Sequence, residues 1–200
     1  MAKAKRKSSK AARSVGARKN APTDAIALLK GDHRQVEGWF EEFESARSDT
    51  RKKTLASNIC QALAAHTTIE EEIFYPAFLE ATGEQDIHHE AEVEHSGAKK
   101  LIAEIEASGP EDEYYDAKVT VLSEMIKHHV KEEEQRDGMF AKARQSGMDL
   151  KTLGESLATR KAELMNATAS EEEPAQRRVG GSRSNQPGFV ARIAKRFQNE

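Results

Sequence analysis

Residues 55–76 read LASNICQALAAHTTIEEEIFYP, and this stretch decides the fold. Leu55, Ile59 and Leu63 follow one another at four-residue spacing, as on the buried face of an α-helix. The same line continues through His66 and Glu70, so an imidazole and a carboxylate stand where the pattern calls for apolar side chains. The stretch therefore predicts a helix that turns ionisable groups toward a core.

Three further segments show the same helical periodicity, with apolar residues at three- and four-residue spacing. The helix-breaking residues Gly83 and Gly109-Pro110 separate the second, third and fourth helical segments. The periodic pattern of the fourth segment ends between Gly138 and Gly147. No segment alternates with the two-residue period of a strand. We therefore predict an all-α protein, an up-down-up-down four-helix bundle. The apolar positions are Ile26, Leu29, Val36, Phe40 and Phe43, then Ala91, Ala98, Ile102 and Ile105, then Tyr115, Val119, Leu122, Ile126 and Val130.

The charge distribution divides the chain into an acidic body and two basic ends. Residues 1–22 carry eight Lys and Arg and no acid, residues 174–200 carry six and one acid, and residues 23–173 carry 17 basic and 33 acidic side chains. We expect a disordered basic tail over residues 1–22 and the bundle over residues 23–147. An additional short C-terminal accessory helix over 148–168 and a flexible basic tail over 169–200 complete the predicted organisation.

Composition excludes several classes of protein. The apolar runs are far shorter than the roughly 20 residues of a membrane span, and no signal-type apolar segment follows the basic N-terminus. We expect a cytoplasmic protein with no membrane span. Cys60 is the only cysteine, which excludes a disulfide framework and a cysteine-based zinc or iron–sulfur site. Any metal here must be held by histidines and carboxylates.

Each of the four predicted helices turns at least one histidine inward. Glu70 and Glu133 each follow one of these histidines by four residues, so both side chains of each pair project from one helix face. A carboxylate buried beside several imidazoles calls for a positive charge among them, which a metal ion supplies. Imidazole and carboxylate ligation without thiolates favours iron or manganese, and two such pairs can hold two bridged ions. The inward histidines are His33, His66, His95 and His129.

Structural roles compete with this interpretation at single positions. One histidine on an apolar line is more often a hydrogen-bonded core residue than a ligand, and one HxxxE pair often forms a surface salt bridge. The pattern repeated over four helices favours metal binding. His128 also lies on an apolar line, with Val121 and Met125, so spacing alone does not separate it from His129.

Four segments resemble the hemerythrin-like, HHE cation-binding family over about residues 24–145. They are GDHRQVEGWF (31–40), HTTIEEEIFYP (66–76), EAEVEH (90–95) and HHVKEEE (128–134). The resemblance implies a four-helix bundle with a non-haem di-iron centre that binds dioxygen or related small molecules. By position it implies that Glu70 and Glu133 bridge the ions, and it selects His129 rather than His128. The implied metal ligands are His33, His66, Glu70, His95, His129 and Glu133.

The third helix departs from the family's usual HxxxH pattern, because Ala91 stands four residues before His95. Glu92 or His88 would fill the missing position, and otherwise water would. Loss of an imidazole is expected to lower the reduction potential and to leave more room for exogenous ligands. We expect this change to favour peroxide chemistry, sensing or iron handling over reversible oxygen carriage.

The sequence supports two functions from different classes. The first is a hemerythrin-like non-haem iron protein whose partner is dioxygen, another small diatomic molecule or peroxide. The second is a helical sensor or scaffold whose basic tails contact nucleic acid non-specifically or an anionic surface, although such tails also simply improve solubility. No substrate pocket is evident beyond the metal site. We therefore assign no catalytic residues and favour binding over enzymatic activity.

Overall fold

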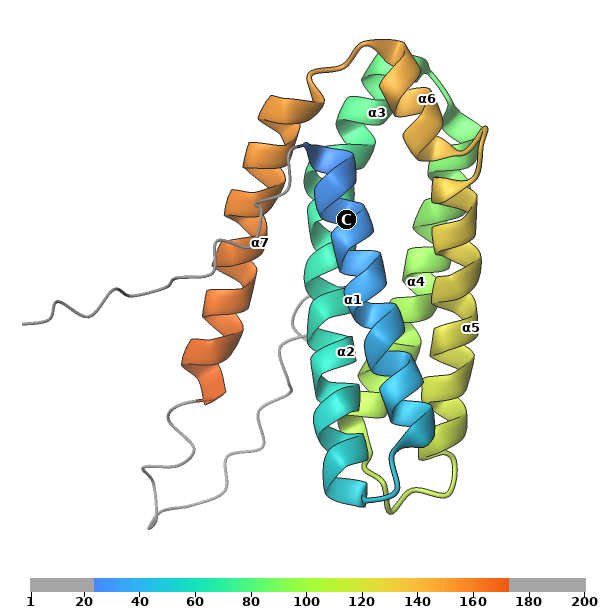
Figure 1. Cartoon of the computed structure of the whole chain (residues 1–200), viewed down its shortest axis with the longest axis vertical. Coiled ribbons are helices and arrows are strands. Elements are labelled where there is room, and N and C mark those ends of the chain that lie inside the picture. The colour runs from blue at the N-terminus through green and yellow to red at the C-terminus, as the bar shows by residue number, and fades with distance from the viewer. Residues whose placement is uncertain (1–23, 173–200) are drawn as a thin grey trace, which may run out of the picture.

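The computed structural model describes residues 24–172, and the regular secondary structure in that range is helical. Four long helices run alternately down and up and form the predicted bundle (Figure 1). The tail predicted over residues 1–22, and the part beyond residue 172 of that predicted over 169–200, lie outside the described residues. The bundle helices are α1 (Ala25–Ser45), α2 (Asp49–Ile69), α4 (Gln85–Ala107) and α5 (Tyr115–Glu134).

Local sequence explains where the helices begin and end. The side chain of Asp24 accepts a hydrogen bond from the backbone N–H of Ala27 at 2.8 Å, which caps α1. Ser48 caps α2 in the same way through the N–H of Arg51, at 3.3 Å. Gly83 ends α3 (Tyr75–Thr82) in the left-handed conformation, at φ +71°, which glycine adopts without strain.

A π-turn interrupts the second bundle helix. Residues Glu70–Phe74 form this turn, η1, and the backbone N–H of Tyr75 bonds to the carbonyl of Glu70 five residues earlier. The chain then continues directly into α3, whose second residue is Pro76. The change in winding therefore lies just before this proline.

Two apolar cores fill the bundle, one above the other. The lower core lies toward the α1–α2 connection and includes Phe40, Ile59, Leu122 and others from all four long helices. The upper core lies toward α3 and α6 (Met139–Ser146) and includes Phe74, Phe78 and Phe140. Buried histidines and glutamates separate these two cores.

The C-terminal part of the chain is more helical than expected. Helix α6 occupies the region where the sequence suggested that helical structure runs out, and α7 (Leu150–Glu172) has 23 residues, so it is not short. Leu157 is fully buried, and a Cβ atom at Gly154 would lie 2.7 Å from the backbone nitrogen of Ala25. The beginning of α7 therefore packs closely on α1. In the sequence, glycines and leucines that pack a helix against the bundle look the same as those of an exposed amphipathic helix.

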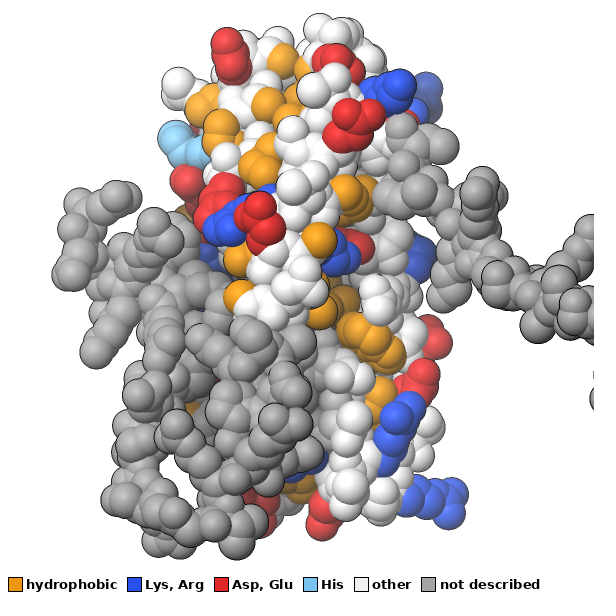
Figure 2. All heavy atoms as spheres, turned by 90° about the vertical axis from the view of Figure 1, so that its left-hand side faces the viewer, with side chains coloured by type: hydrophobic (Ala, Val, Ile, Leu, Met, Phe, Trp, Pro, Cys, Tyr) orange, Lys and Arg blue, Asp and Glu red, His pale blue; other side chains and the backbone are white. Residues whose placement is uncertain are grey.

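Figure 2 looks on to the side of the molecule that carries α7. Hydrophobic side chains lie there among acidic and basic ones in the described part of the surface. None of the described helices combines the length and apolar character that a bilayer crossing needs.

Candidate metal centre

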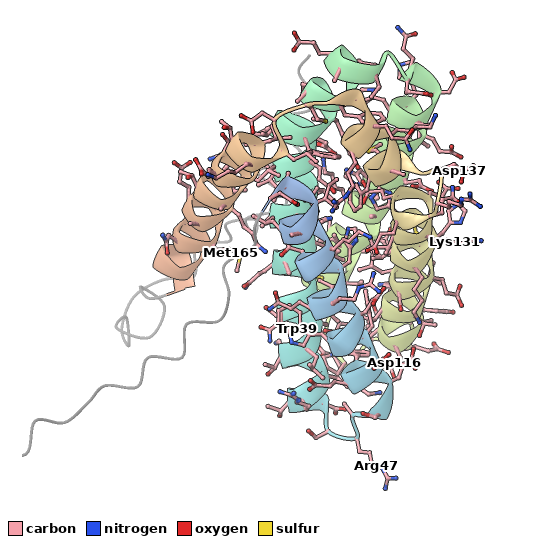
Figure 3. All side chains as sticks on the ribbon, turned by 45° about the horizontal axis from the view of Figure 1, so that its top comes forward. Trp39, Arg47, Asp116, Lys131, Asp137 and Met165 are labelled. Carbon is pink, nitrogen blue, oxygen red and sulfur yellow. The ribbon has the colours of Figure 1, made fainter. Side chains whose placement is uncertain are left out.

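The structure brings all six principal sequence-predicted ligands together between the two cores. Their side chains come from α1, α2, η1, α4 and α5, so each bundle helix contributes (Figure 3 shows how side chains fill the space between these helices). Each of the six residues is at most 4% exposed. They are His33, His66, Glu70, His95, His129 and Glu133.

The four imidazoles form two pairs. The Nε2 atoms of His33 and His66 lie 3.1 Å apart, and those of His95 and His129 lie 3.2 Å apart. Glu70 Oε2 lies 3.2 Å from His66 Nε2 and 3.4 Å from His95 Nε2, so this carboxylate reaches both pairs.

Glu133 also spans the two pairs. Its Oε2 lies 3.4 Å from His33 Nε2 and 3.7 Å from His129 Nε2. The possible ligand atoms form two groups, His33, His66, Glu70 and Glu133 in one and Glu70, His95 and His129 in the other. The two groups share Glu70, as two bridged ions require.

Hydrogen bonds leave the central carboxylates unsatisfied. Both oxygens of Glu70 and Oε2 of Glu133 are buried without a hydrogen-bond partner. Burial opposes ionisation of Glu70, but the positive charge of His66 holds the pKa of Glu70 well below its ordinary value. Burial, and then the negative charge of Glu70, raise the pKa of Glu133. Bound cations would satisfy these oxygens and their charge, so the donor set fits metal ions.

Every histidine of the cluster turns its second ring nitrogen to a carboxylate on a neighbouring helix. The Nδ1 atom of His33 lies 2.8 Å from Glu134, that of His66 lies 3.3 Å from Asp32, that of His95 lies 3.0 Å from Glu71, and that of His129 lies 2.8 Å from Glu94. These contacts form a closed ring around the bundle, from α1 to α2, from η1 to α4, from α4 to α5 and from α5 back to α1. A carboxylate on Nδ1 fixes the proton there and leaves Nε2 free to bind a metal.

Cationic side chains hold three of these four carboxylates. Lys161 of α7 donates to Asp32 at 2.5 Å, Lys99 donates to Glu71, and Arg34 donates to Glu134 at 2.6 Å. Burial opposes ionisation of each carboxyl group, yet the hydrogen bonds and these positive charges lower the pKa of all three. These three carboxylates therefore stay ionised at neutral pH.

Tyr75 also reaches the centre, although its position in the sequence favours core packing over a hydrogen bond there. Its phenol oxygen lies 3.2 Å from His95 Nε2 and 3.4 Å from Glu133 Oε1, and the side chain is fully buried. In an uninterrupted helix of 3.6 residues per turn, Tyr75 would lie about half a turn away from His66. The extra residue of the π-turn brings it round to the same side. A π-turn leaves little trace in apolar periodicity. The spacing of Tyr75 from His66 alone therefore could not place its side chain at the centre.

Two lower-ranked candidates lie elsewhere. Glu92 is 52% exposed and faces His88 at 3.7 Å, so its carboxylate is turned toward solvent, where hydration stabilises its charge. His88 packs edge-on against the ring of Tyr75, at 5.8 Å between centroids, and belongs to neither central group of ligand atoms among the described residues. Burial also separates the two adjacent histidines of α5, since His129 is buried and the side chain of His128 is 61% exposed.

A small cavity adjoins the four imidazoles on the side of the lower core. Val36, Leu63 and Ile126 form its apolar wall, and its volume is about 10 Å³. That is roughly the room of one water-sized molecule.

The fold and the site match a known family. The Hemerythrin HHE cation binding domain matches residues 24–141. The chain belongs to this family. Together, the membership and the interior His/Glu cluster indicate that this hemerythrin-domain protein has a site for metal cations.

Two similar proteins were found. A crystal structure of a hemerythrin HHE cation-binding domain-containing protein from Mycobacterium kansasii superposes with a TM-score of 0.62 at 23% identity, over 74% of this chain and 91% of that chain. A protein from Nostoc sp. (strain PCC 7120) named DNA nickase is 29% identical over 107 residues, which is 54% of this chain. The matched part spans only 30% of the Nostoc protein's length.

Proposed function

We propose that this hemerythrin-domain protein is a non-haem di-iron protein that binds dioxygen or a related small molecule, including peroxide. One observation carries the proposal. Four buried imidazoles turn Nε2 toward two shared carboxylates, while each Nδ1 is tied to a carboxylate of the next helix. This arrangement orients every imidazole for a metal inside the bundle.

The residues divide naturally between two ions. His33 and His66 would hold one ion, His95 and His129 the other, and Glu70 and Glu133 would bridge them. When bound, two irons supply redox electrons and open positions for an exogenous ligand. Six ligands for two ions leave such positions free, which differs from the closed four-ligand shell of a structural zinc site.

The surroundings limit what can bind. The cavity beside the imidazoles has a wall of Val36, Leu63 and Ile126 and admits only a molecule of a few atoms. The phenol oxygen of Tyr75 lies beside His95 and Glu133, and its O–H can donate a hydrogen bond into the centre. A donor next to an open position favours a ligand that gains negative charge when it is reduced, as peroxide and reduced dioxygen do.

Metal analysis and a visible spectrum of the aerobically purified full chain test the proposal. We expect about two irons per chain and the absorption bands of an oxo-bridged pair. The double variant His66→Ala with Glu70→Ala should lose the iron, whereas His89→Ala, an exposed histidine of α4, should keep it. A wild-type protein without iron, or unchanged iron in the double variant, would contradict the assignment.

A second measurement separates peroxide chemistry from oxygen carriage. The reduced protein should be oxidised by dioxygen or peroxide without forming a stable, reversible oxygen complex. The variant Tyr75→Phe should keep its iron and change the rate of that oxidation, because only the phenol O–H is removed. A long-lived oxygenated spectrum that reverses on removal of oxygen would instead assign the protein to oxygen carriage.

Contact with DNA is a second candidate function. The Nostoc relative is named a DNA nickase, and residues 1–22 of this chain carry eight Lys and Arg without an acid. We propose that this basic segment binds nucleic-acid phosphates without sequence preference. Gel shifts with plasmid DNA should weaken steeply as salt rises, and replacing the eight basic residues by Gln should abolish them. No shift at low salt would exclude this function, and nicking of supercoiled plasmid would extend it.

A further inference from the structure

A pocket of about 280 Å³ runs from the surface to the metal centre between α4, α5 and α6. Glu133 and His129 form its inner end, and Ala91, which stands where the family's usual pattern has a histidine, forms part of its wall. The missing imidazole therefore leaves room at the point where this pocket meets the centre. Asp137, which is exposed on the turn between α5 and α6 (Figure 3), also lines the pocket.

The pocket is strongly acidic. Glu90, Glu94, Glu132 and Asp137 line it together with Glu133, and Lys142 is the one basic residue among its described lining residues. Lys142 donates to Glu84 at 2.6 Å, which offsets its charge.

The end of α5 adds to the negative potential of the pocket. Gly138 lines it and lies against the carbonyl oxygens of Glu132 and Glu133, in the last turn of the helix. The C-terminal end of a helix carries partial negative charge. Such a channel attracts cations and repels anions.

Two lining residues of the pocket, Glu94 and Glu132, form a group with the chemistry of a cation site together with the exposed His128. His128 Nε2 lies 3.3 Å from Glu94 Oε1 and 3.2 Å from Glu132 Oε1, and ligand atoms of all three residues lie within 4.8 Å of one another. We call Glu94, His128 and Glu132 the mouth cluster. Glu94 also connects it to the centre, because its other oxygen, Oε2, bonds to Nδ1 of His129 at 2.8 Å.

A second observation points inward from this cluster. Glu133 is 2% exposed, lines the inner end of the pocket, and has Oε2 without a hydrogen-bond partner. An unsatisfied carboxylate oxygen at the end of an acidic channel is a destination for a cation that enters it.

We propose that the mouth cluster is a divalent-cation site through which ions enter the pocket and load the centre. The proposal rests on the proposed function only for the destination, since the mouth cluster itself needs no filled centre. The cation exchanges water for the His128 imidazole and one carboxylate oxygen from each glutamate, then passes along the acidic wall to Glu133. No covalent or redox change accompanies this transfer.

Loading kinetics test the entry route. Co²⁺ is added to the metal-free full chain in a stopped-flow instrument, and its visible absorption bands report arrival at the centre. The variant His128→Ala with Glu132→Gln should load at least about 10-fold more slowly at low salt, and its centre should reach the same final occupancy and spectrum as that of the wild type. Glu124→Gln, which removes an exposed charge of the same helix, and His89→Ala should load like the wild type. Equal loading rates in the mouth variant and the controls would overturn the route.

Equilibrium binding of Mn²⁺, followed by water-proton relaxation, tests the mouth cluster itself. The wild type should bind one additional weak ion beyond those of the centre. The mouth variant should lose that ion, and Glu124→Gln should keep it. If the centre binds no ions but the weak Mn²⁺ ion is present and depends on His128, the proposed function fails and the mouth site stands. If the centre fills and no such ion exists, the mouth site is wrong.

Discussion

At the scale of single residues, each buried histidine of the cluster contacts a carboxylate that is a sequence neighbour of another residue of the cluster. Asp32 precedes His33, Glu71 follows Glu70, Glu94 precedes His95 and Glu134 follows Glu133. Adjacent helix positions lie about 100° apart, so the neighbour of an inward residue points sideways toward the next helix. Each helix thus supplies a candidate ligand to the centre and a hydrogen-bond acceptor to the adjacent helix.

Replacing Glu134 by Gln should weaken metal binding by about 10- to 100-fold, because the amide keeps the hydrogen bond to His33 but loses the charge that makes the imidazole a stronger ligand. Competition with a chromophoric chelator measures this affinity. Glu37→Gln is the matched control, since Glu37 pairs with Arg34 at 3.2 Å as Glu134 does. Equal weakening in both variants would show that the ion pair with Arg34, and not His33, is responsible.

Burial also determines the chemistry of Cys60. It is 1% exposed, and burial, assisted by the negative charge of Glu106, raises the pKa of its thiol well above the ordinary value. The reactive thiolate is therefore scarce in the folded protein. Iodoacetamide at about pH 8 should leave native Cys60 unmodified and alkylate it rapidly in guanidinium chloride, as intact-mass analysis would show. Fast native alkylation would mean that this part of the lower core opens.

At the scale of elements, the limits of sequence reasoning are clearest along α2 and η1. The positions of His66 and Glu70 in an apolar line were sufficient to predict an interior site, because regular helical geometry applies up to Glu70. For Tyr75 the sequence favoured core packing over a hydrogen bond at the centre, because the π-turn changes the phase by one residue after Glu70 and spacing does not reveal that change. Helix α6 was missed because eight residues, Met139–Ser146, carry too little periodicity to distinguish a helix from a loop.

The contact between α7 and α1 gives a test at the element scale. Gly154→Ala should destabilise the protein by about 1–3 kcal/mol, because the added Cβ would meet the backbone of Asp24 and Ala25 at 2.7 Å. Gly31→Ala in α1, where nothing lies within 4 Å of the added Cβ, should stabilise by about 1 kcal/mol through helix propensity. Urea unfolding followed by circular dichroism measures both. An unchanged stability in Gly154→Ala would show that α7 is not packed as described.

At the scale of the whole molecule, a layer of ionisable groups separates two apolar cores. The four-helix arrangement could be predicted because the apolar residues of one helix face supply both cores. On α1, for instance, Ile26 and Leu29 above His33 belong to the upper core, and Phe40 below it belongs to the lower core. The order in which the helices pair through the ring of carboxylates could not be predicted. It depends on which adjacent helix each of these carboxylates contacts. Without cations, the layer between the cores holds buried oxygens that lack partners.

Removing the metal should therefore lower the thermal stability of the whole bundle. An ion present at about a thousand times its Kd stabilises by about 4 kcal/mol, which for a chain of this size corresponds to a fall in Tm of roughly 10 °C on chelation. Differential scanning calorimetry before and after dialysis against a chelator measures the change, and re-addition of Fe²⁺ without oxygen should reverse it. An identical Tm after verified metal removal would contradict a role of the ions in stability.

The hydrogen bond from Lys161 to Asp32 has a practical consequence for work with shortened proteins. The family similarity ends at residue 141, yet Lys161 of α7 holds the carboxylate that orients His66. A fragment trimmed to the family boundary would lose this lysine and expose the apolar residues that Leu157 covers. Such a fragment would misrepresent the metal affinity of the intact chain, so the smallest faithful unit for biochemistry includes α7.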